Sequence, residues 1–515
     1  MMQIFIVLTA FFLRAFNIGL FPINHDEASW TIPGINNFDT FCGFPVSCFH
    51  GYIQPIYSDL VFVSKNIFAA PELLVRMPAI IIGTCTVSLM YLLAREAYGR
   101  KTGLIAAALL CFLPWHILQS RIGVSLILTP LFGCLIATAL LKSAHTQRGV
   151  WFYLFCCLLS IGSFYTYQAS LVFLPVFGAA IVIIKKDLKW LRPKQVFLGC
   201  LGFLVMLYPL AHLYFNGKIP QYFGKVYRMY DGSFMGQGGN LLMKSFVNLK
   251  LNLVPAFKGI FFANPFILYG QAMKNPLLAH WITLPLFAIG IALACVRKRS
   301  ADKLFLAWAV LGYLCALSGV RFFADRYFFT IILPPCLVLI ALPLAYLFEK
   351  RLDFVGLRRL GFFLCGTAFF CSLVFLEITQ WGKYYYTAPI DFEECRFNSY
   401  GCQQAALYLN SIPEVEECII REATNMEPLG IYRSYYRYGN VYSAGKWNPS
   451  GEAKASFFLH WAEETHPNNY RGGMFSRPRE QFMKKYPYAK PLRIIYYPDG
   501  QPAIKIYKIE TNTES

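Results

Sequence analysis

Residues 3–30 read QIFIVLTAFFLRAFNIGLFPINHDEASW, and they place an acidic pair, Asp26 and Glu27, directly after an apolar run. An apolar run of this length predicts a first membrane-spanning helix. The run contains Arg14 and lacks both the basic n-region and the small-residue cleavage site of a secretory signal, so we expect it to be retained. The acidic pair then lies where the chain leaves the bilayer and meets water.

The composition of the whole chain is that of a membrane protein. Its 515 residues are 56% hydrophobic and only 15% charged. Unpaired backbone groups are costly in lipid, and the apolar runs show no alternating strand pattern, so they must be helices. They predict a polytopic α-helical membrane protein with about eleven spans, at residues 3–20, 77–94, 103–119, 123–141, 151–167, 170–184, 196–215, 278–296, 303–320, 328–348 and 360–378.

The distribution of Lys and Arg over the short loops predicts the orientation of these spans. One set of short loops holds only Arg121, Arg321 and Arg326, whereas the opposite set is rich in basic residues: Arg95, Arg100, Lys101, Lys142, Arg148, Lys185, Lys186, Lys189, Arg192, Lys194, Arg297, Lys298, Arg299, Lys303, Lys350, Arg351, Arg358 and Arg359. The basic set faces the cytoplasm, which puts the acidic pair, two long loops (about 21–76 and 216–277) and the C-terminal segment outside. Much of the net charge of +19 is this orientation signal, and the remaining basic residues can face anionic lipid, so the charge needs no nucleic-acid partner.

From Gln380 onward the composition becomes mixed, which predicts a transmembrane domain over residues 1–379 and a small extracytoplasmic α/β domain over residues 380–515. Pro498-Asp499-Gly500 is typical of a β-hairpin turn. The periodicities predict helices at 403–409 and 479–485 and strands at 418–421, 455–461, 493–497 and 503–508.

Five of the 16 cysteines lie on the predicted oxidising side of the membrane: Cys42, Cys48, Cys395, Cys402 and Cys418. Their short spacing makes Cys42 and Cys48 a disulfide candidate. Cys395 and Cys402 are a second possible pair, which would leave Cys418 over. No Cys/His grouping has metal-ligand spacing, so the sequence predicts no metal site of that kind. We expect no cofactor, and the sequence leaves open whether a divalent metal assists.

Several short motifs occur in a characteristic order along the chain. They are Leu13-Arg14 with Asp26-Glu27, Gln54-Pro55-Ile56-Tyr57, Leu74-Val75-Arg76-Met77-Pro78 with Gly83, Tyr98-Gly99 with Gly103-Leu104, Ser120-Arg121, and Arg326-Tyr327 with Leu333-Pro334. Their order resembles that of the GT-C membrane glycosyltransferases, and within this class the group of protein O-mannosyltransferases and bacterial lipid A aminoarabinose transferases. The resemblance covers nearly the whole chain. It implies a bacterial inner-membrane enzyme with its active site on the extracytoplasmic face.

The resemblance implies that a sugar passes, with inversion, from a polyprenyl-phosphate carrier to a hydroxyl group of a lipid, glycan or protein acceptor. The attacking hydroxyl must lose a proton, and Asp26 is the expected base. Glu27 is expected to orient the acceptor or a sugar hydroxyl. The alternative is that the acidic pair only marks the water side of a helix. In a membrane protein of unknown family, this is the commoner explanation of such a pair.

Cations near the departing phosphate would lower the barrier to transfer. Arg76 and Arg326 lie at the predicted outer membrane edge and are expected to bind this phosphate, with Tyr327 as a further donor. Either arginine could instead extend to lipid phosphates without a catalytic role. Arg14 is expected to pair with a backbone carbonyl or with the loop acids.

The first outer loop departs from the family pattern at Gln54, where several relatives carry a basic residue. The candidate substrate residues in the two outer loops are therefore Gln54, Tyr57, Lys225 and Arg228, with Lys218 as a further possibility. A transporter or flippase for lipid-linked sugars is the rival class, but such proteins place ionisable residues at mid-membrane and have internal repeats. A ligase that uses pyrophosphate-linked donors is a third possibility.

The predicted topology can be tested with reporter fusions at Thr146 and Thr387. We expect the two fusions to report opposite sides of the membrane, because the basic loops are retained in the cytoplasm. A cytoplasmic signal from both fusions would contradict the eleven-span arrangement.

Overall fold

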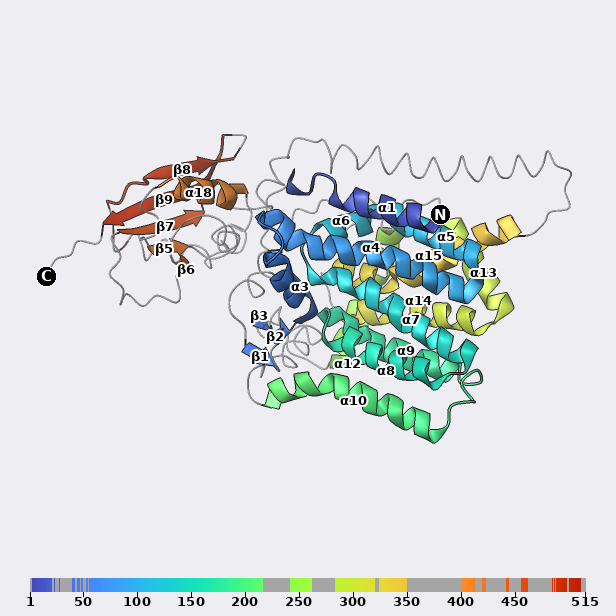
Figure 1. The fold of residues 1–515 in the computed structure, drawn as a ribbon. Helices are drawn as coiled ribbons and strands as arrows, with labels where there is room; N and C mark the ends of the chain where they lie inside the picture. The colour runs from blue at the N-terminus through green and yellow to red at the C-terminus, as the bar shows by residue number, and fades with distance from the viewer. Residues whose placement is uncertain are drawn as a thin grey trace, which may run out of the picture.

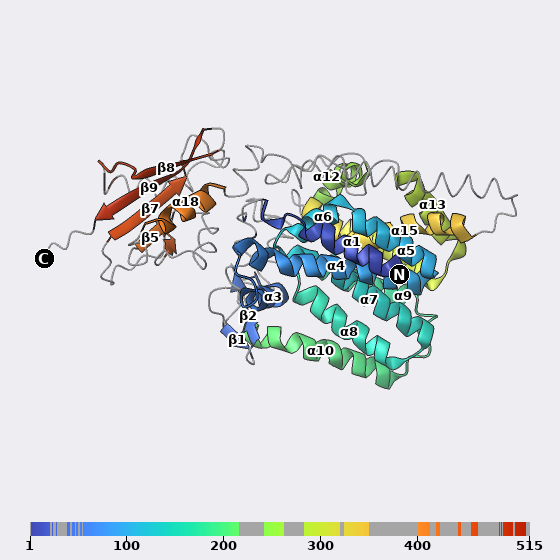
Figure 2. The ribbon, with the colours of Figure 1, turned by 45° about the horizontal axis from the view of Figure 1, so that its top comes forward.

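A computed structural model describes residues 2–20, 23, 27, 39–41, 44–46, 48–49, 52–53, 55–215, 241–261, 283–319, 324–349, 400–412, 419–422, 441–443, 455–461, 484, 486, 488–497 and 500–510. Within these ranges, residues up to 349 form mainly a bundle of helices, and residues from 400 onward form a small sheet with a helix (Figure 1). The sheet lies beyond one end of the bundle in both ribbon views (Figures 1 and 2).

The long helix α4 (Pro71–Tyr98) organises the N-terminal half of the bundle. Pro71 at its first position and Glu72 in its first turn are favourable there, because proline lacks a donor and an acid complements the helix dipole. The helix ends at Gly99, whose φ of 94° suits glycine. Its neighbours are α1 (Met2–Ala15), α3 (Pro55–Lys65), α5 (Arg100–Phe112), α6 (Pro114–Arg121) and α7 (Leu128–Thr146).

The second half of the bundle packs around Trp308, which is fully buried. The Trp308 ring contacts the rings of Phe173, Phe177 and Phe305. The remaining described helices are α8 (Gly149–Phe164), α9 (Phe173–Ile183), α10 (Pro193–Phe215), α12 (Leu241–Phe261), α13 (Thr283–Arg297), α14 (Ser300–Gly319) and α15 (Ala324–Glu349), with short 3-10 turns η1 (Ile18–Leu20), η2 (Ser125–Ile127) and η3 (Gln168–Val172).

Among the described residues, three helical segments are long and apolar enough to cross a membrane: Pro71–Tyr98, Ser125–Thr146 and Pro193–His212. The bent pair of α5 and α6 is a fourth candidate, and five further apolar helices are shorter. The chain is thus a multi-pass helical protein, as predicted. The number of eleven spans stays a prediction, and the proposed span at 360–378 lies outside the described residues.

One predicted span is wrong in its shape. Residues 103–119 were expected to form a single helix, but α5 and α6 meet at a bend of 60°. Leu113 is extended at the break, and Pro114 has no N–H to donate to the Leu110 carbonyl four residues earlier. Arg14 of α1 donates instead to the carbonyls of Leu110 and Cys111, each at 3.4 Å. This arginine is fully buried and therefore binds backbone carbonyls, one of the two roles expected for it.

Two predicted outer loops contain regular structure. Residues 55–65 form α3, and residues 241–261 form α12, which packs against α14. Asn252 of α12 donates to the Leu317 carbonyl at 3.1 Å. Tyr313 donates to the Leu253 carbonyl at 2.7 Å. The first outer loop also contains two short antiparallel hairpins, which pair β1 (Asp39–Phe41) with β2 (Phe44–Val46) and β3 (Cys48–Phe49) with β4 (Tyr52–Ile53).

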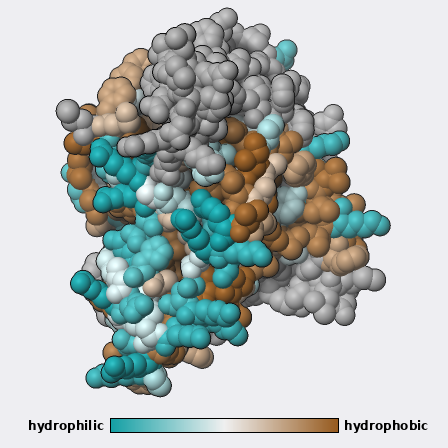
Figure 3. All heavy atoms as spheres, turned by 90° about the vertical axis from the view of Figure 1, so that its right-hand side faces the viewer, coloured by the Kyte–Doolittle hydropathy of each residue, from teal (hydrophilic) through white to brown (hydrophobic). Residues whose placement is uncertain are grey.

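The other end of the bundle is held by Asp302, which is fully buried at the start of α14. Its carboxylate accepts hydrogen bonds from the Tyr98 hydroxyl at 2.8 Å and from Arg297 Nη2 at 2.7 Å. The end of α4 and the start of α14 are therefore neighbours. Figure 3 looks onto this end and shows hydrophilic side chains gathered there, with hydrophobic surface beside them.

The C-terminal sheet has the strand order β6-β5-β7-β9-β8. The strands β5, β6 and β7 are parallel, whereas β9 is antiparallel to β7 and β8. Helix α18 (Tyr400–Asn410) buries Ala405 and Leu409, which belong to the same apolar core as Ile504 and Ile506 of β9. The strands are β5 (Ile419–Glu422), β6 (Val441–Ser443), β7 (Ala455–Trp461), β8 (Arg493–Tyr496) and β9 (Pro502–Glu510).

Most of the elements predicted for this small domain are present. The helix at 403–409 and the four strands are confirmed within a residue or a few, and the hairpin before β9 turns at Gly500 with a φ of 85°. The predicted helix at 479–485 lies mostly outside the described residues. Cys395 also lies outside them, so its possible disulfide with Cys402 stays a prediction. Strand β6 was not predicted. The boundary at residue 380 remains a prediction.

Candidate functional site

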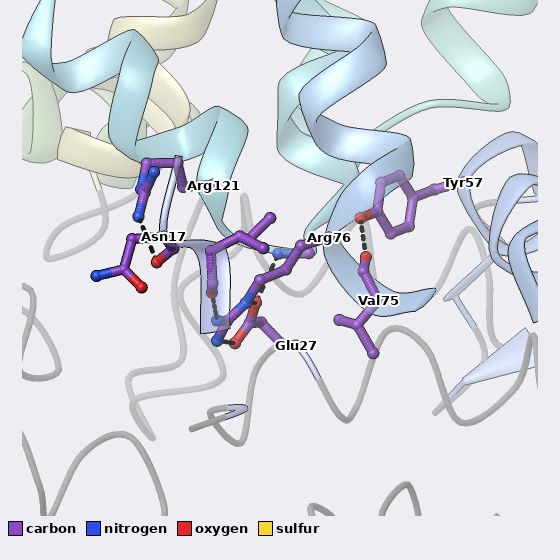
Figure 4. A network of polar contacts seen from close by, with 8 residues as sticks. Asn17, Glu27, Tyr57, Val75, Arg76 and Arg121 are labelled. Carbon is purple, nitrogen blue, oxygen red and sulfur yellow. Dashed lines mark hydrogen bonds and ion pairs between the residues drawn. The ribbon is translucent and has the colours of Figure 1, made fainter. Parts of the chain in front are cut away.

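The segment that carries the acidic pair Asp26 and Glu27 is called the acidic loop below. It is anchored by a buried ion pair between Glu27 and Arg76 (Figure 4). Arg76 lies in the second turn of α4, and its Nε and Nη2 atoms donate to the two carboxylate oxygens of Glu27 at 2.7 and 2.8 Å. Glu27 is fully buried, and Arg76 is only 4% exposed. A two-pronged contact of this kind is strong and fixes the orientation of both groups. It joins the segment after α1 to the start of α4.

Glu27 has another partner that the sequence analysis did not identify. The backbone N–H of Gly123 donates to Glu27 Oε1 at 2.8 Å. A Cβ atom at position 123 would lie 2.6 Å from the Val75 carbonyl oxygen and 2.3 Å from a methyl group of Val75, so only glycine lets the chain pass this close to α4. The only sequence signal for this contact was a glycine two residues after the motif Ser120-Arg121. A single glycine is too common to indicate a site.

The third nitrogen group of Arg76 is also engaged. Its Nη1 donates to the Ile18 carbonyl at 2.7 Å, just beyond the end of α1. All three donor groups of the guanidinium therefore contact protein atoms. The predicted contact between Arg76 and a donor phosphate stays a prediction.

Tyr57, one of the candidate substrate residues, is buried in α3 beside this ion pair. Its hydroxyl donates to the Val75 carbonyl at 2.9 Å. Burial raises the pKa of the Tyr57 phenol well above its ordinary value, and the nearby Glu27 carboxylate raises it further while Arg76 acts in the opposite direction. The phenol is therefore a neutral donor that ties α3 to α4.

Several predicted site residues lie outside the described residues: Asp26, Gln54, Lys225, Arg228 and Cys42. For Arg326, Tyr327 and Cys48 the structure describes the backbone alone, in the first turn of α15 and in β3. Their predicted roles stay predictions. Among the predicted site residues whose side chains are described, the structure brings together Glu27, Tyr57 and Arg76.

The backbone path places the start of α15 at the same end of the bundle as this site. Helix α14 begins beside the end of α4, where Asp302 binds Tyr98. Its 20 residues then run back along the bundle, past Trp308, which packs close to Gly133 in the first half of α7. The start of α15 follows after residues 320–323, so the backbone of Arg326 lies toward the end of the bundle that carries Glu27 and Arg76.

Comparison with known proteins identifies the class of this fold. The whole chain is similar to ArnT from Cupriavidus metallidurans, crystallised bound to undecaprenyl phosphate, with a TM-score of 0.63 and 10% identity over 98% of this chain and 97% of that chain. It is also similar to the Archaeoglobus fulgidus oligosaccharyltransferase crystallised with Zn and sulfate, with a TM-score of 0.53 and 14% identity over 98% and 73% of the two chains. No curated protein sequence matches the chain.

The fold is therefore that of the helical GT-C membrane proteins. Residues 55–213 match the family described as Dolichyl-phosphate-mannose-protein mannosyltransferase, and this stretch contains Tyr57, Arg76 and Gly123. The chain is a membrane glycosyltransferase with the GT-C fold, the class that the motif order predicted.

Removal of Arg76 should be strongly destabilising, because it leaves the Glu27 carboxylate buried without its cation. We expect Arg76→Gln to lower the free energy of unfolding by about 3–5 kcal/mol, with a smaller loss for Arg76→Lys. Glu27→Gln combined with Arg76→Gln should cost less than the sum of the two single changes. Denaturation in detergent, with Arg95→Gln as an exposed control, measures these differences; an Arg76→Gln variant as stable as the control would contradict the assignment.

Asp59 of α3 should make stability depend on pH. Burial raises the pKa of Asp59 to about 7, and its Oδ1 atom is buried without a hydrogen-bond partner in the described structure. The unfolded chain ionises this group near its ordinary pKa of about 4, so stability falls as pH rises from about 4 to about 7 and then levels off. The gain in melting temperature from Asp59→Asn should therefore be larger at pH 8 than at pH 5. An equal gain at both values would show that the carboxyl ionises normally.

Proposed function

We propose that this protein transfers a sugar from a polyprenyl-phosphate-linked donor to a lipid, glycan or protein acceptor on the extracytoplasmic face of the membrane, with inversion at the anomeric carbon. The observation that carries the proposal is the buried contact of Glu27 with Arg76 and Gly123, which anchors an acidic loop at the end of the bundle. With the predicted topology, a site at this position would have access both to lipid-borne donors and to acceptors in water.

The likeness to relatives supports a lipid-linked donor. The family that matches residues 55–213 is named for a dolichyl-phosphate-linked mannose donor. The ArnT protein with the same fold was crystallised with undecaprenyl phosphate. Both carriers are polyprenyl phosphates, so we propose this class of carrier, and we leave the sugar open because pocket contacts rather than the fold decide it.

In the proposed reaction Asp26 acts as the base. It accepts the proton of the acceptor hydroxyl while the hydroxyl oxygen forms a bond to the anomeric carbon and the bond from that carbon to the phosphate oxygen breaks. Glu27 directly follows Asp26, and its carboxylate is already bound by three donor groups of the protein. We therefore assign Glu27 the role of holding the loop, in place of the expected contact with a sugar or acceptor hydroxyl.

The departing phosphate gains negative charge, which fixed cations and donors stabilise. We propose that Arg326 and Tyr327 at the start of α15 supply these contacts, and that Lys225 and Arg228 replace the basic residue that is absent at Gln54. Arg76 is better placed to hold Glu27, because its guanidinium already makes three contacts within the protein. A direct contact of Arg76 with phosphate remains a prediction.

Transfer itself can be measured by mass spectrometry of glycolipids and surface glycans in strains with and without the protein. We expect the deletion to remove a specific glycosyl modification. Asp26→Asn should lower its formation by roughly 10²- to 10⁴-fold while the protein stays folded in the membrane, because this change removes the base and keeps the size of the side chain.

Asp187→Asn is a control for loss of a carboxylate, because Asp187 accepts a hydrogen bond from Ser300 at the opposite end of the bundle. This variant should retain transfer. Normal transfer by Asp26→Asn would remove Asp26 from the mechanism. If deletion changes only the distribution of the lipid-linked sugar between the two leaflets, the protein is a flippase instead.

A further inference from the structure

Arg121, at the end of α6, binds the end of α1. The last carbonyls of a helix have no partner within it. Arg121 Nη1 donates to the carbonyls of Phe16 at 2.5 Å and Arg14 at 3.1 Å, and its Nη2 donates to that of Asn17 at 3.2 Å. Asn17 has a φ of 49°, the left-handed conformation that commonly ends a helix. A buried cation here also complements the negative end of the helix dipole.

Gly123 lies two residues further along the same turn. Ile122 between them is extended, with φ −104° and ψ 132°, and Val124 closes the turn by donating to the Ile122 carbonyl at 2.8 Å. The Gly123 N–H is thereby directed at Glu27. We call residues 121–123 the Arg121–Gly123 corner. One arm of the corner holds the end of α1, and the other holds the carboxylate at position 27.

These contacts fix both ends of the segment that carries the acidic pair. Arg121 fixes the chain at residues 14–17, Arg76 holds it at Ile18, and Arg76 and Gly123 together hold it at Glu27. Consecutive Cα atoms are only about 3.8 Å apart, so a fixed Glu27 also limits where Asp26 can lie.

We propose that the Arg121–Gly123 corner is a positioning element that sets the place of the acidic loop for glycosyl transfer. This inference rests on the proposed function, in which Asp26 is the base. The corner acts through the loop and does not touch the substrate. Misplacement of a catalytic group by about 1 Å can cost on the order of 10²-fold in rate, so the corner is expected to affect turnover more than donor binding.

The first measurement needs no substrate. Hydrogen–deuterium exchange of peptides covering residues 13–27 should become faster in Arg121→Gln and in Gly123→Ala, which break the two arms independently. Exchange in α7 and in the C-terminal sheet should not change. Arg121→Lys should restore much of the protection, because its ammonium group can still donate to several carbonyls. Arg297→Gln removes a contact to Asp302 at the other end of the bundle and should leave residues 13–27 unaffected.

The second measurement is turnover per folded molecule, with an undecaprenyl-phosphate-linked sugar as the donor once mass spectrometry has identified the sugar and its acceptor. We expect kcat to fall about 10²-fold in Arg121→Gln and Gly123→Ala, with KM for the donor changed less than about threefold, and Arg121→Lys to recover part of kcat. Arg297→Gln should keep the wild-type kcat.

Two results would overturn the proposal: unchanged exchange of residues 13–27 in both corner variants, or faster exchange with wild-type kcat per folded molecule. In either case transfer by the wild-type protein and its loss in Asp26→Asn would leave the proposed function intact. If the wild-type protein transfers no sugar, the proposed function itself fails, and the exchange result then still shows whether the corner holds the loop.

Discussion

The bidentate contact between Glu27 and Arg76 is the interaction on which the arrangement of this end of the molecule depends. It joins three segments that are distant in sequence, because Arg76 belongs to α4, Glu27 follows α1, and Gly123 follows α6. A buried ion pair is costly to desolvate, so its value lies less in net stability than in fixing one geometry. Here the geometry it fixes is that of the acidic loop.

The membrane environment explains why arginines carry so much of this structure. A break in a helix leaves carbonyl groups without donors, and lipid cannot supply hydrogen bonds. Arg14 of α1 binds the carbonyls at the broken end of α5, and Arg121 of α6 binds those at the end of α1. Helix α1 thus satisfies the end of α5, and α6 satisfies the end of α1. This exchange permits the bend that brings Gly123 against α4.

Individual residues show where sequence reasoning succeeded and where it stopped. The order of the motifs predicted the GT-C class, and the positions of Arg76 and Glu27 pointed to one site, because both flank apolar runs at the same predicted membrane edge. The contact between them was not predictable, since the interval between positions 27 and 76 carries no periodicity that fixes a distance. Arg76 was expected to bind a phosphate because it lies at the outer membrane edge and in a motif. The structure adds its contact with Glu27, and the phosphate contact stays a prediction.

The sequence by itself determined that this is a multi-pass helical membrane protein with a small mixed domain at its end, because long apolar runs and alternating patterns are local properties. It also determined the class of enzyme through motif order. Only the tertiary structure decided that 100–121 forms two helices, that 241–261 packs as a helix on α14, and that Gly123 completes the Glu27 site. Those features depend on side chains of other segments, such as Arg14 and Val75, reaching positions that local sequence cannot specify.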